Sequence, residues 1–221
     1  MIKILEETTK EPITMIGKMA GVCYGSNTED ELKNFQRGLD CLESGHMRAA
    51  EYPDVYMIID GYSARVIREL YTHIGGAPTR LQSSTRYIKY GDFDYYTPPA
   101  IATDPEKKEK YDYIMYIISE AYKDLLAMDA KKEDIGNILP LGMITKVVVK
   151  YNLRELINIS RQRECTRAYI EFRQLMKELK EQLTDYSVEW GYLVEHYMYP
   201  KCEELGYCTE KNGCGRKPKK I

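Results

Sequence analysis

The 221-residue chain is poor in aromatic variety and has no long apolar segment. One Trp and three Phe stand against twenty Tyr, and no apolar run approaches the roughly 20 residues that a bilayer span requires. The first twelve residues, MIKILEETTKEP, lack the apolar stretch of a secretory signal. Neither sign of charge dominates, because 32 Lys and Arg face 34 Asp and Glu. A net charge of −2 offers no broad basic field for nucleic acid. We therefore expect a cytoplasmic protein that binds neither membrane nor nucleic acid.

Closely spaced cysteines are also missing, which bears on metal binding. Cys202, Cys208 and Cys214 are six residues apart, with His196 six residues upstream, so a zinc site is conceivable. Structural zinc ligands usually come in C-x2–4-C pairs, and this chain has none. Disulfides are rare in the cytoplasm. We expect unliganded thiols and no metal, with Cys23, Cys41 and Cys165 as small buried apolar residues.

The hydrophobic pattern predicts a single α+β domain over residues 1–205, with a basic, cysteine-containing tail over 206–221. Residues 55–59 are β-rich and predict a strand buried on both faces. The helix expected to end near Ser44 can be capped by Asn27 or Thr28, and residues 73–87 predict a loop. Further strands are expected over 2–4 and 144–149, and helices over 14–22, 27–44, 63–73, 107–128, 153–183 and 187–205. The many tyrosines fill helix faces or stack on a planar ligand.

Residues 72–90, THIGGAPTRLQSSTRYIKY, combine two glycines, several hydroxyls and two arginines. Glycines permit close backbone approach, and Arg binds phosphate with two hydrogen bonds, so the segment is a candidate phosphate loop. It lacks the Lys-Ser/Thr of a Walker loop and the G-x-G-x-x-G pattern. The alternative is an ordinary ordered loop rich in turn-forming residues.

A second polar segment covers residues 151–173. Arg154, Asn158 and Arg161 follow at intervals of four and three residues, so they share a helix face. One interpretation is a solvated basic face paired with neighbouring glutamates. The other is a binding face, because the amides of Asn152 and Asn158 offer the donors and acceptors that suit a purine or flavin ring edge.

Together these segments resemble the flavin-dependent thymidylate synthases. Residues 68–73, RELYTH, followed by 82–87, QSSTRY, resemble the family's R-H-R and N-E-x-S-x-R-Y signature. The family's L-P … N-x-R-S-L … R … A-Q-W-E-I segment is resembled by Leu139-Pro140, followed by NLREL over 152–156, Asn158, Arg163 and Arg167-Ala168. Gly45-His46 and Val22-Cys23-Tyr24 are weaker matches, and the motifs occur in family order between residues 20 and 180.

The resemblance implies an α+β fold with a central, largely antiparallel sheet flanked by long helices, assembled as a homotetramer. It implies a methyltransferase that converts dUMP to dTMP, with 5,10-methylenetetrahydrofolate as carbon donor and FAD, reduced by NADPH, as the hydride carrier. A fixed guanidinium can stabilise charge on the uracil ring, and Arg163 is the catalytic residue implied. The implied substrate-binding residues are Glu69, Thr72, Gln82, Ser83, Ser84 and Arg86. The implied FAD-binding residues are His46, Thr72, His73, Ile74, Arg80, Gln82, Asn152, Arg154 and Asn158.

The sequence departs from the family pattern at three places. The R-H-R triplet reads Thr72-His73-Ile74, Leu81-Gln82 replaces Asn-Glu, and Gly136 stands where many members carry a phosphate-binding arginine. Arg80 could return a lost positive charge. The spacing of Gln82, Ser84 and Arg86 predicts that an extended loop points all three side chains the same way, and the alternative is a turn in which a hydroxyl caps its own backbone. Alternatives for the whole chain are a flavoenzyme acting on another pyrimidine nucleotide, or an inactive nucleotide-binding or assembly relative.

Overall fold

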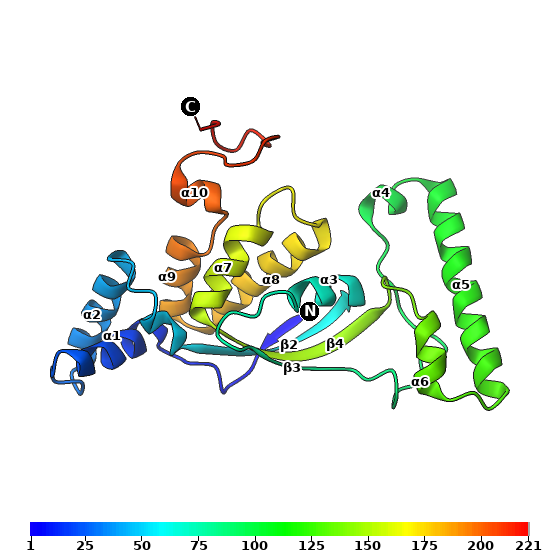
Figure 1. Cartoon of the computed structure of the whole chain (residues 1–221), viewed down its shortest axis with the longest axis horizontal. Coiled ribbons are helices and arrows are strands. Elements are labelled where there is room, and N and C mark those ends of the chain that lie inside the picture. The colour runs from blue at the N-terminus through cyan, green and yellow to red at the C-terminus, as the bar shows by residue number, and fades with distance from the viewer. Residues whose placement is uncertain (221) are drawn as a thin grey trace. The chain divides into compact units, whose positions relative to one another are not determined.

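The computed structural model describes residues 1–220 and divides into two compact units that alternate along the chain. Unit 1 comprises Met1, 59–72 and 81–147, and unit 2 comprises 2–58, 73–80 and 148–221. Figure 1 labels the elements, which in order are β1 (Ile2–Ile4), α1 (Pro12–Cys23), α2 (Glu31–Glu43), η1 (Ala49–Glu51), β2 (Asp54–Ser63), α3 (Ala64–Leu70), β3 (Thr79–Gln82), α4 (Pro99–Ala102), α5 (Pro105–Ala127), α6 (Lys132–Ile135), η2 (Gly136–Ile138), β4 (Ile144–Asn152), α7 (Leu153–Arg163), α8 (Ile170–Tyr186), α9 (Val188–Tyr197) and α10 (Lys201–Leu205).

The strands form one antiparallel sheet in the order β1-β2-β4-β3, which confirms the predicted α+β class. Strands β2, β3 and β4 each contribute residues to both units. Burial alternates along β2, where Val55, Met57 and Ile59 are buried while Tyr56 and Ile58 are half-buried. The expectation of a strand buried on both faces was wrong, because only one face packs on the apolar core.

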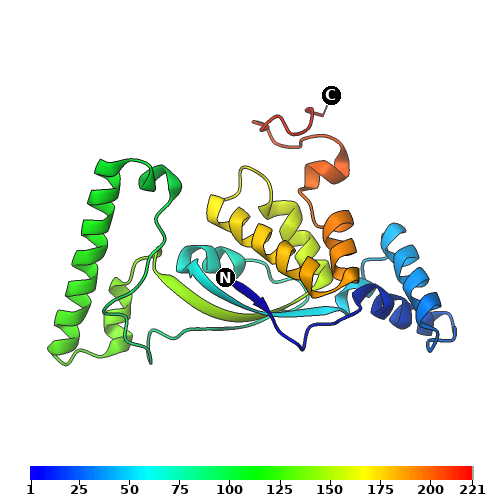
Figure 2. The ribbon, with the colours of Figure 1, turned by 180° about the vertical axis from the view of Figure 1, so that it is seen from behind.

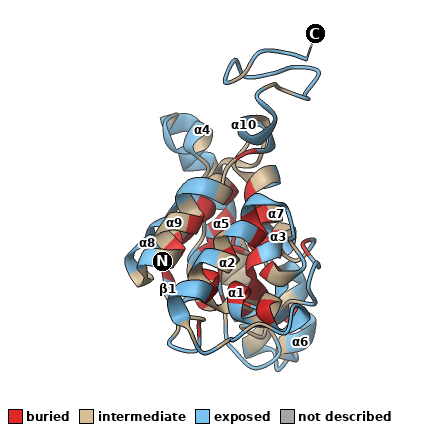
Figure 3. Ribbon diagram, turned by 90° about the vertical axis from the view of Figure 1, so that its left-hand side faces the viewer, coloured by how far each residue is buried: buried red, intermediate tan, exposed pale blue. Residues whose placement is uncertain are grey.

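In unit 2 the strands are covered by helices. Helix α8 packs on β1 and on α9, and Figure 2 shows α8 and α9 side by side. Phe172, Leu175 and Leu179 of α8 are at most 1% exposed. Helix α1 packs closely on α2, where a Cβ on Gly17 would lie 1.7 Å from a backbone oxygen of α2. Figure 3 shows buried stretches of α1 and α7 between exposed ones.

Several predicted element ends were wrong, for local reasons. The helix predicted over 153–183 is two helices, because a turn over 164–169 lets α8 fold back against α7. The helix predicted over 187–205 stops before Pro200, which has no N–H to donate. Asp30, rather than Asn27 or Thr28, caps α2 by accepting a hydrogen bond from Lys33 N. The predicted loop over 73–87 contains β3, whose edge continues with Ser83 N donating to Lys146 O at 2.9 Å.

Unit 1 carries the second half of β2, α3, β3's last residues and the helices α4 to α6. Ser63 ends β2 and caps α3 by accepting from Val66 N at 3.2 Å. Helix α5 packs against α4 and α6. No helix of the described residues is long and apolar enough to cross a membrane.

Candidate active site

The strand-to-helix junction at Asn152 organises the candidate site in unit 2. Asn152 ends β4 with an extended backbone, and its side chain accepts a hydrogen bond from Glu155 N at 2.9 Å, which caps α7. Asn152 and Glu155 are both buried, with exposed fractions of 5% and 6%. The Asn152 cap therefore fixes where α7 begins, and Arg154 and Asn158, four residues apart, lie on the same face of this helix.

A cavity of about 270 Å³ lies against this first turn. We call it the amide cavity, and its lining consists of Glu51, Gly75, Gly76, Asn152, Arg154, Glu155 and Asn158. The two glycines approach α7 closely, since a Cβ on Gly76 would lie 1.9 Å from Asn152 Nδ2 and one on Gly75 2.0 Å from Glu155 Oε2. Gly76 also has a φ of +69°, which favours glycine. A side chain at either position would therefore require Asn152 or Glu155 to shift.

The lining of the amide cavity contains more acidic than basic side chains. The Arg154 guanidinium forms an ion pair with Glu51, and the Glu155 carboxylate is a second acid in the lining, bound by Asn158 Nδ2 at 3.3 Å. One cation and two carboxylates leave the lining without surplus positive charge for a pyrophosphate. The amides of Asn152 and Asn158 suit instead the edge of a heterocycle that carries donors and acceptors.

Arg163, at the end of α7, is held by His73 and Phe172. Its Nε donates to His73 Nε2 at 3.0 Å, and its guanidinium carbon lies 4.9 Å from the centre of the Phe172 ring. His73 meets the same ring edge-on at 6.1 Å. Hydrogen bonding and stacking on a buried ring orient the guanidinium plane far better than either contact alone.

His73 is a neutral imidazole in this cluster. It is 5% exposed, and burial, followed by the nearby Arg163 charge, lowers the pKa of His73 from 6.5 to about 4. The Glu155 carboxylate, 3.8 Å from Nδ1, acts in the opposite direction. Burial and Arg163 outweigh it, because Nε2 accepts from a permanently charged donor and an imidazolium has no lone pair to accept with. The remaining proton is therefore on Nδ1 and faces Glu155.

The other residues expected to bind FAD lie outside the amide cavity. His46 is exposed in the turn after α2, with Nδ1 3.1 Å from Ser44 Oγ. Ile74 is 70% exposed, and Arg80 lies in β3. The structure thus brings together Asn152, Arg154 and Asn158, and separately joins His73 to Arg163.

The residues expected to bind substrate all belong to unit 1. Ser84 Oγ accepts from Arg86 N at 3.2 Å, and Tyr87 N and Ile88 N donate to Ser84 O. The segment after β3 is therefore a turn, and the predicted extended loop over 82–86 was wrong, because hydroxyl capping satisfies the backbone locally. Gln82 Nε2 donates to Thr145 Oγ1 at 3.1 Å. Arg86 is exposed and pairs with Glu133 at 3.0 Å.

Glu69 and Thr72 lie at the end of α3. Thr72 Oγ1 donates to Glu69 O at 2.7 Å, and the Glu69 carboxylate is 3.9 Å from Arg65 Nε. Gly136 lies beside the 82–86 segment, because a Cβ on Gly136 would be 3.1 Å from Thr85 Cβ. The position where many relatives have a phosphate-binding arginine thus adjoins the hydroxyl-rich turn.

Sequence reasoning did not find Glu51, Glu155 or Phe172 as members of these clusters. Glu155 follows Asn152 by three residues, the spacing at which a helix cap places an acid in the first turn. No local pattern identifies Glu51 or Phe172, which come from other elements.

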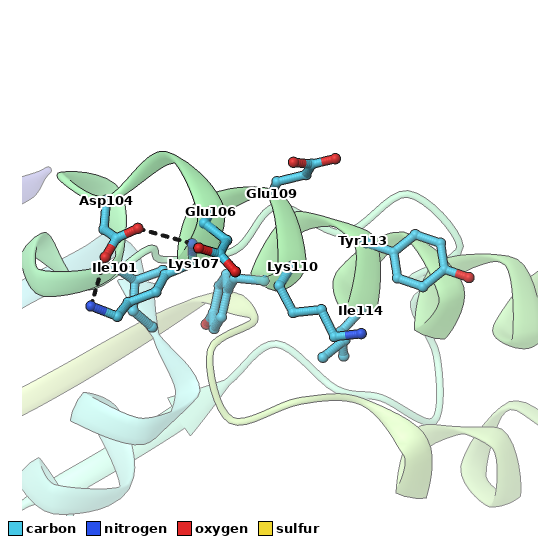
Figure 4. A pocket seen from close by; sticks show the side chains of 9 residues that line it. Ile101, Asp104, Glu106, Lys107, Glu109, Lys110, Tyr113 and Ile114 are labelled. Carbon is cyan, nitrogen blue, oxygen red and sulfur yellow. Dashed lines mark hydrogen bonds and ion pairs between the residues drawn. The ribbon is translucent and has the colours of Figure 1, made fainter.

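A second, larger space of about 960 Å³ runs along α4 and the first turns of α5 in unit 1. Figure 4 shows the charged side chains of Asp104, Glu106, Lys107 and Lys110 along it, with Asp104 bound to Lys107. None of the expected site residues lines it.

Comparison with known proteins identifies the class. The family described as "Thymidylate synthase complementing protein" matches residues 4–186. The chain therefore belongs to this family.

Individual relatives carry a more specific name. The flavin-dependent thymidylate synthase of Nitratidesulfovibrio vulgaris is 29% identical over 236 residues, covering 95% of this chain and 92% of the relative. That of Pyrococcus furiosus is 28% identical over 243 residues, covering 100% and 96%. The crystal structure of flavin-dependent thymidylate synthase ThyX from Helicobacter pylori, complexed with FAD and dUMP, has a TM-score of 0.69 at 20% identity, covering 89% of this chain and 99% of that one. This likeness concerns the fold.

Proposed function

We propose that this chain is an FAD-dependent thymidylate synthase that methylates dUMP to dTMP. The carbon comes from 5,10-methylenetetrahydrofolate and the electrons from NADPH. Membership of the family and the named relatives support the activity. The observation in this chain that carries it is the Arg163 cluster, because it supplies a rigid, permanently charged donor beside a cavity lined with amides.

Arg163 stabilises the negative charge that develops on the uracil ring when C6 is attacked. A guanidinium that is already oriented by His73 and Phe172 needs little rearrangement at that moment, which is the condition for effective electrostatic catalysis. Neutral His73 is suited to this role, because it accepts from Arg163 without adding a second positive charge. The Glu155 carboxylate lies 3.8 Å from the other ring nitrogen of His73.

Asn152, Asn158 and Arg154 hold FAD at the amide cavity. A volume of about 270 Å³ accommodates a ring edge rather than a whole dinucleotide, and the donor set fits that edge. His73, Ile74, Arg80, Thr72, Gln82 and the less central His46 complete the proposed FAD contacts. Bound FAD supplies the hydride transfer, so the protein needs no cysteine nucleophile.

The turn after β3 binds the nucleotide. Ser83, Ser84 and Arg86 provide hydroxyls and a cation for phosphate, with Gln82, Thr72 and Glu69 as further contacts. Arg86 is available at low cost, because its pair with Glu133 is a surface ion pair with 65% and 45% of the two side chains exposed.

We infer that a homotetramer covers an apolar stripe on α5. Tyr113, Ile114, Tyr116 and Ile117 are 45–58% exposed on consecutive turns. Contiguous large apolar side chains at a surface indicate an interface, and a second copy of the same helix is the simplest partner in a symmetric assembly. Light scattering of wild type and Tyr116→Glu tests this, with loss of the tetramer in the variant as the expected result and an unchanged mass as the contradicting one. We propose a cytoplasmic location, which membership of a family with nucleotide-synthesising relatives supports.

Two measurements test the proposed reaction. The absorbance spectrum of purified protein should show flavin bands, and a dUMP assay with methylenetetrahydrofolate and NADPH should yield dTMP. Flavin without dTMP would favour a flavoenzyme acting on another pyrimidine nucleotide. Absence of both flavin binding and dTMP formation would favour a nucleotide-binding or assembly relative.

A further inference from the structure

Four of the six cysteines meet at one cavity in unit 2, away from the amide cavity. This space of about 290 Å³ lies among the loop after α7, helix α10 and the tail. Cys165, Cys202, Cys208 and Cys214 line it together, and all four are free thiols. Within residues 1–220, no group of three or more His, Cys, Asp or Glu side chains is placed to hold a metal ion. What the four side chains share is a thiol group and a common cavity.

The tail is folded against the loop that follows Arg163. Arg167 Nη1 donates to Asn212 O at 3.3 Å and its Nε lies 3.2 Å from Glu210. Arg216 Nη1 donates to Glu164 O at 3.5 Å. Cys208 N donates to Pro218 O at 2.7 Å, which closes the tail on itself. These contacts hold the tail cysteines beside Cys165.

The Cys214 side chain is accessible to solvent, and its surroundings favour the thiolate form. It is exposed, and hydrogen bonds from the Thr166 side chain and from Arg216 N, together with the Arg216 charge, lower the pKa of its thiol. Cys208 lines the same cavity, and its sulfur lies against Gly213, the residue before Cys214, because a Cβ on Gly213 would be 3.2 Å from Cys208 Sγ. An accessible, activated thiol next to a second thiol is the arrangement of peroxide-sensing cysteines.

We propose that Cys214 and Cys208 form a hydroperoxide-reactive dithiol site, with Cys214 as the attacking thiol and Cys208 as the resolving one. The Cys214 thiolate attacks one oxygen of the hydroperoxide, the O–O bond breaks, and the leaving oxygen takes a proton to give water or an alcohol. Cys214 is then a sulfenic acid. The Cys208 thiolate attacks its sulfur, the S–S bond forms, the S–O bond breaks, and the departing hydroxide takes a proton to give water. Two thiols are oxidised by two electrons, and one hydroperoxide is reduced.

Oxidation of this dithiol site should also lower the turnover that depends on Arg163, and this consequence rests on the proposed function. Thr166 is three residues after Arg163, and a hydrogen bond from its hydroxyl is the largest cause of the lowered pKa of the Cys214 thiol. A disulfide sulfur is a poor partner for that hydroxyl compared with a thiolate, so the loop that ends α7 loses one of its contacts. Turnover should therefore fall in the oxidised protein and recover on reduction.

The experiment treats the reduced full-length protein with hydrogen peroxide at pH 7, blocks remaining thiols by alkylation, and maps the peptides by mass spectrometry. Cys23, which is exposed and lies outside the cavity, is the internal control. Cys214 should be oxidised at least ~10-fold faster than Cys23, with a Cys208–Cys214 disulfide as product. The variant C208S should stop at the sulfenic acid, which a dimedone probe captures, whereas C23S should behave as wild type.

Equal oxidation rates of Cys214 and Cys23 would overturn the proposal, and so would a disulfide from Cys214 to Cys165 or Cys202 in place of Cys208. These readouts do not depend on dUMP or FAD, so they stand apart from the test of the proposed function. Turnover that stays constant after the disulfide has formed would contradict the link to Arg163.

Discussion

Acidification should destabilise the protein through His73. The pKa of His73 is about 4 in the folded chain against 6.5 as its ordinary value, so the unfolded chain takes up a proton first as the pH falls. Stability from this group is complete above pH 6.5, is lost between pH 6.5 and about 4, and changes no further below that. Because one pKa unit corresponds to about 1.4 kcal/mol, the whole loss is roughly 3 kcal/mol, of which about 2 kcal/mol should be gone at pH 5.

The measurement is urea unfolding of wild type and of His73→Gln at pH 7.5, 6 and 5, at one protein concentration and without added flavin or nucleotide. Gln offers an oxygen that accepts from Arg163 but does not titrate, so the difference between the two proteins isolates the imidazole. The free energy of unfolding of wild type should fall by about 2 kcal/mol more than that of the variant between pH 7.5 and pH 5. An identical pH dependence in both proteins would show that protonated His73 is tolerated in the fold, and the reasoning on its burial would be wrong.

Three further predictions concern the proposed site. Arg163→Lys keeps the charge but loses the planar guanidinium that contacts His73 and Phe172. The rate of dTMP formation should therefore fall ~10²–10³-fold at unchanged flavin content. Near-full turnover would contradict the assignment of Arg163 as the catalytic residue. Arg154→Ala leaves Glu51 and Glu155 without a cation in the amide cavity. This variant should therefore purify nearly colourless, whereas Arg163→Lys should stay yellow. Equal flavin per chain in the two variants after dialysis would mean that Arg154 belongs to a solvated helix face instead. Arg86→Ala should weaken dUMP binding by ~1.5–3 kcal/mol in a titration. The control Glu133→Gln removes only the surface partner of Arg86 and should bind dUMP at least as well as wild type. Unchanged dUMP affinity in Arg86→Ala would show that Arg86 does not belong to the site.

Local chemistry in the sequence was enough to predict the elements that carry the site. A strand over 144–149 and a helix from 153 were predicted, and β4 and α7 lie there, with Asn152 at the junction between them. The helical spacing of Arg154 and Asn158 predicted that they share a face, and both line the amide cavity. Gly75-Gly76 indicated close backbone approach to a ligand, and the structure shows them close to the side chains of Asn152 and Glu155. These features depend on neighbours within a few residues, which a sequence pattern can express.

Tertiary structure alone decided which groups meet. Arg163 reaches His73 across 90 residues of sequence, and Glu51 reaches Arg154 across 103. The helix expected over 153–183 is broken into α7 and α8, and α8 packs on β1 and α7. The cysteines at 165, 202, 208 and 214 share a cavity because the tail folds back on the α7 loop. Contacts between residues so far apart in sequence follow from burial and from long-range hydrogen bonds. The spacing of residues along the chain does not predict them.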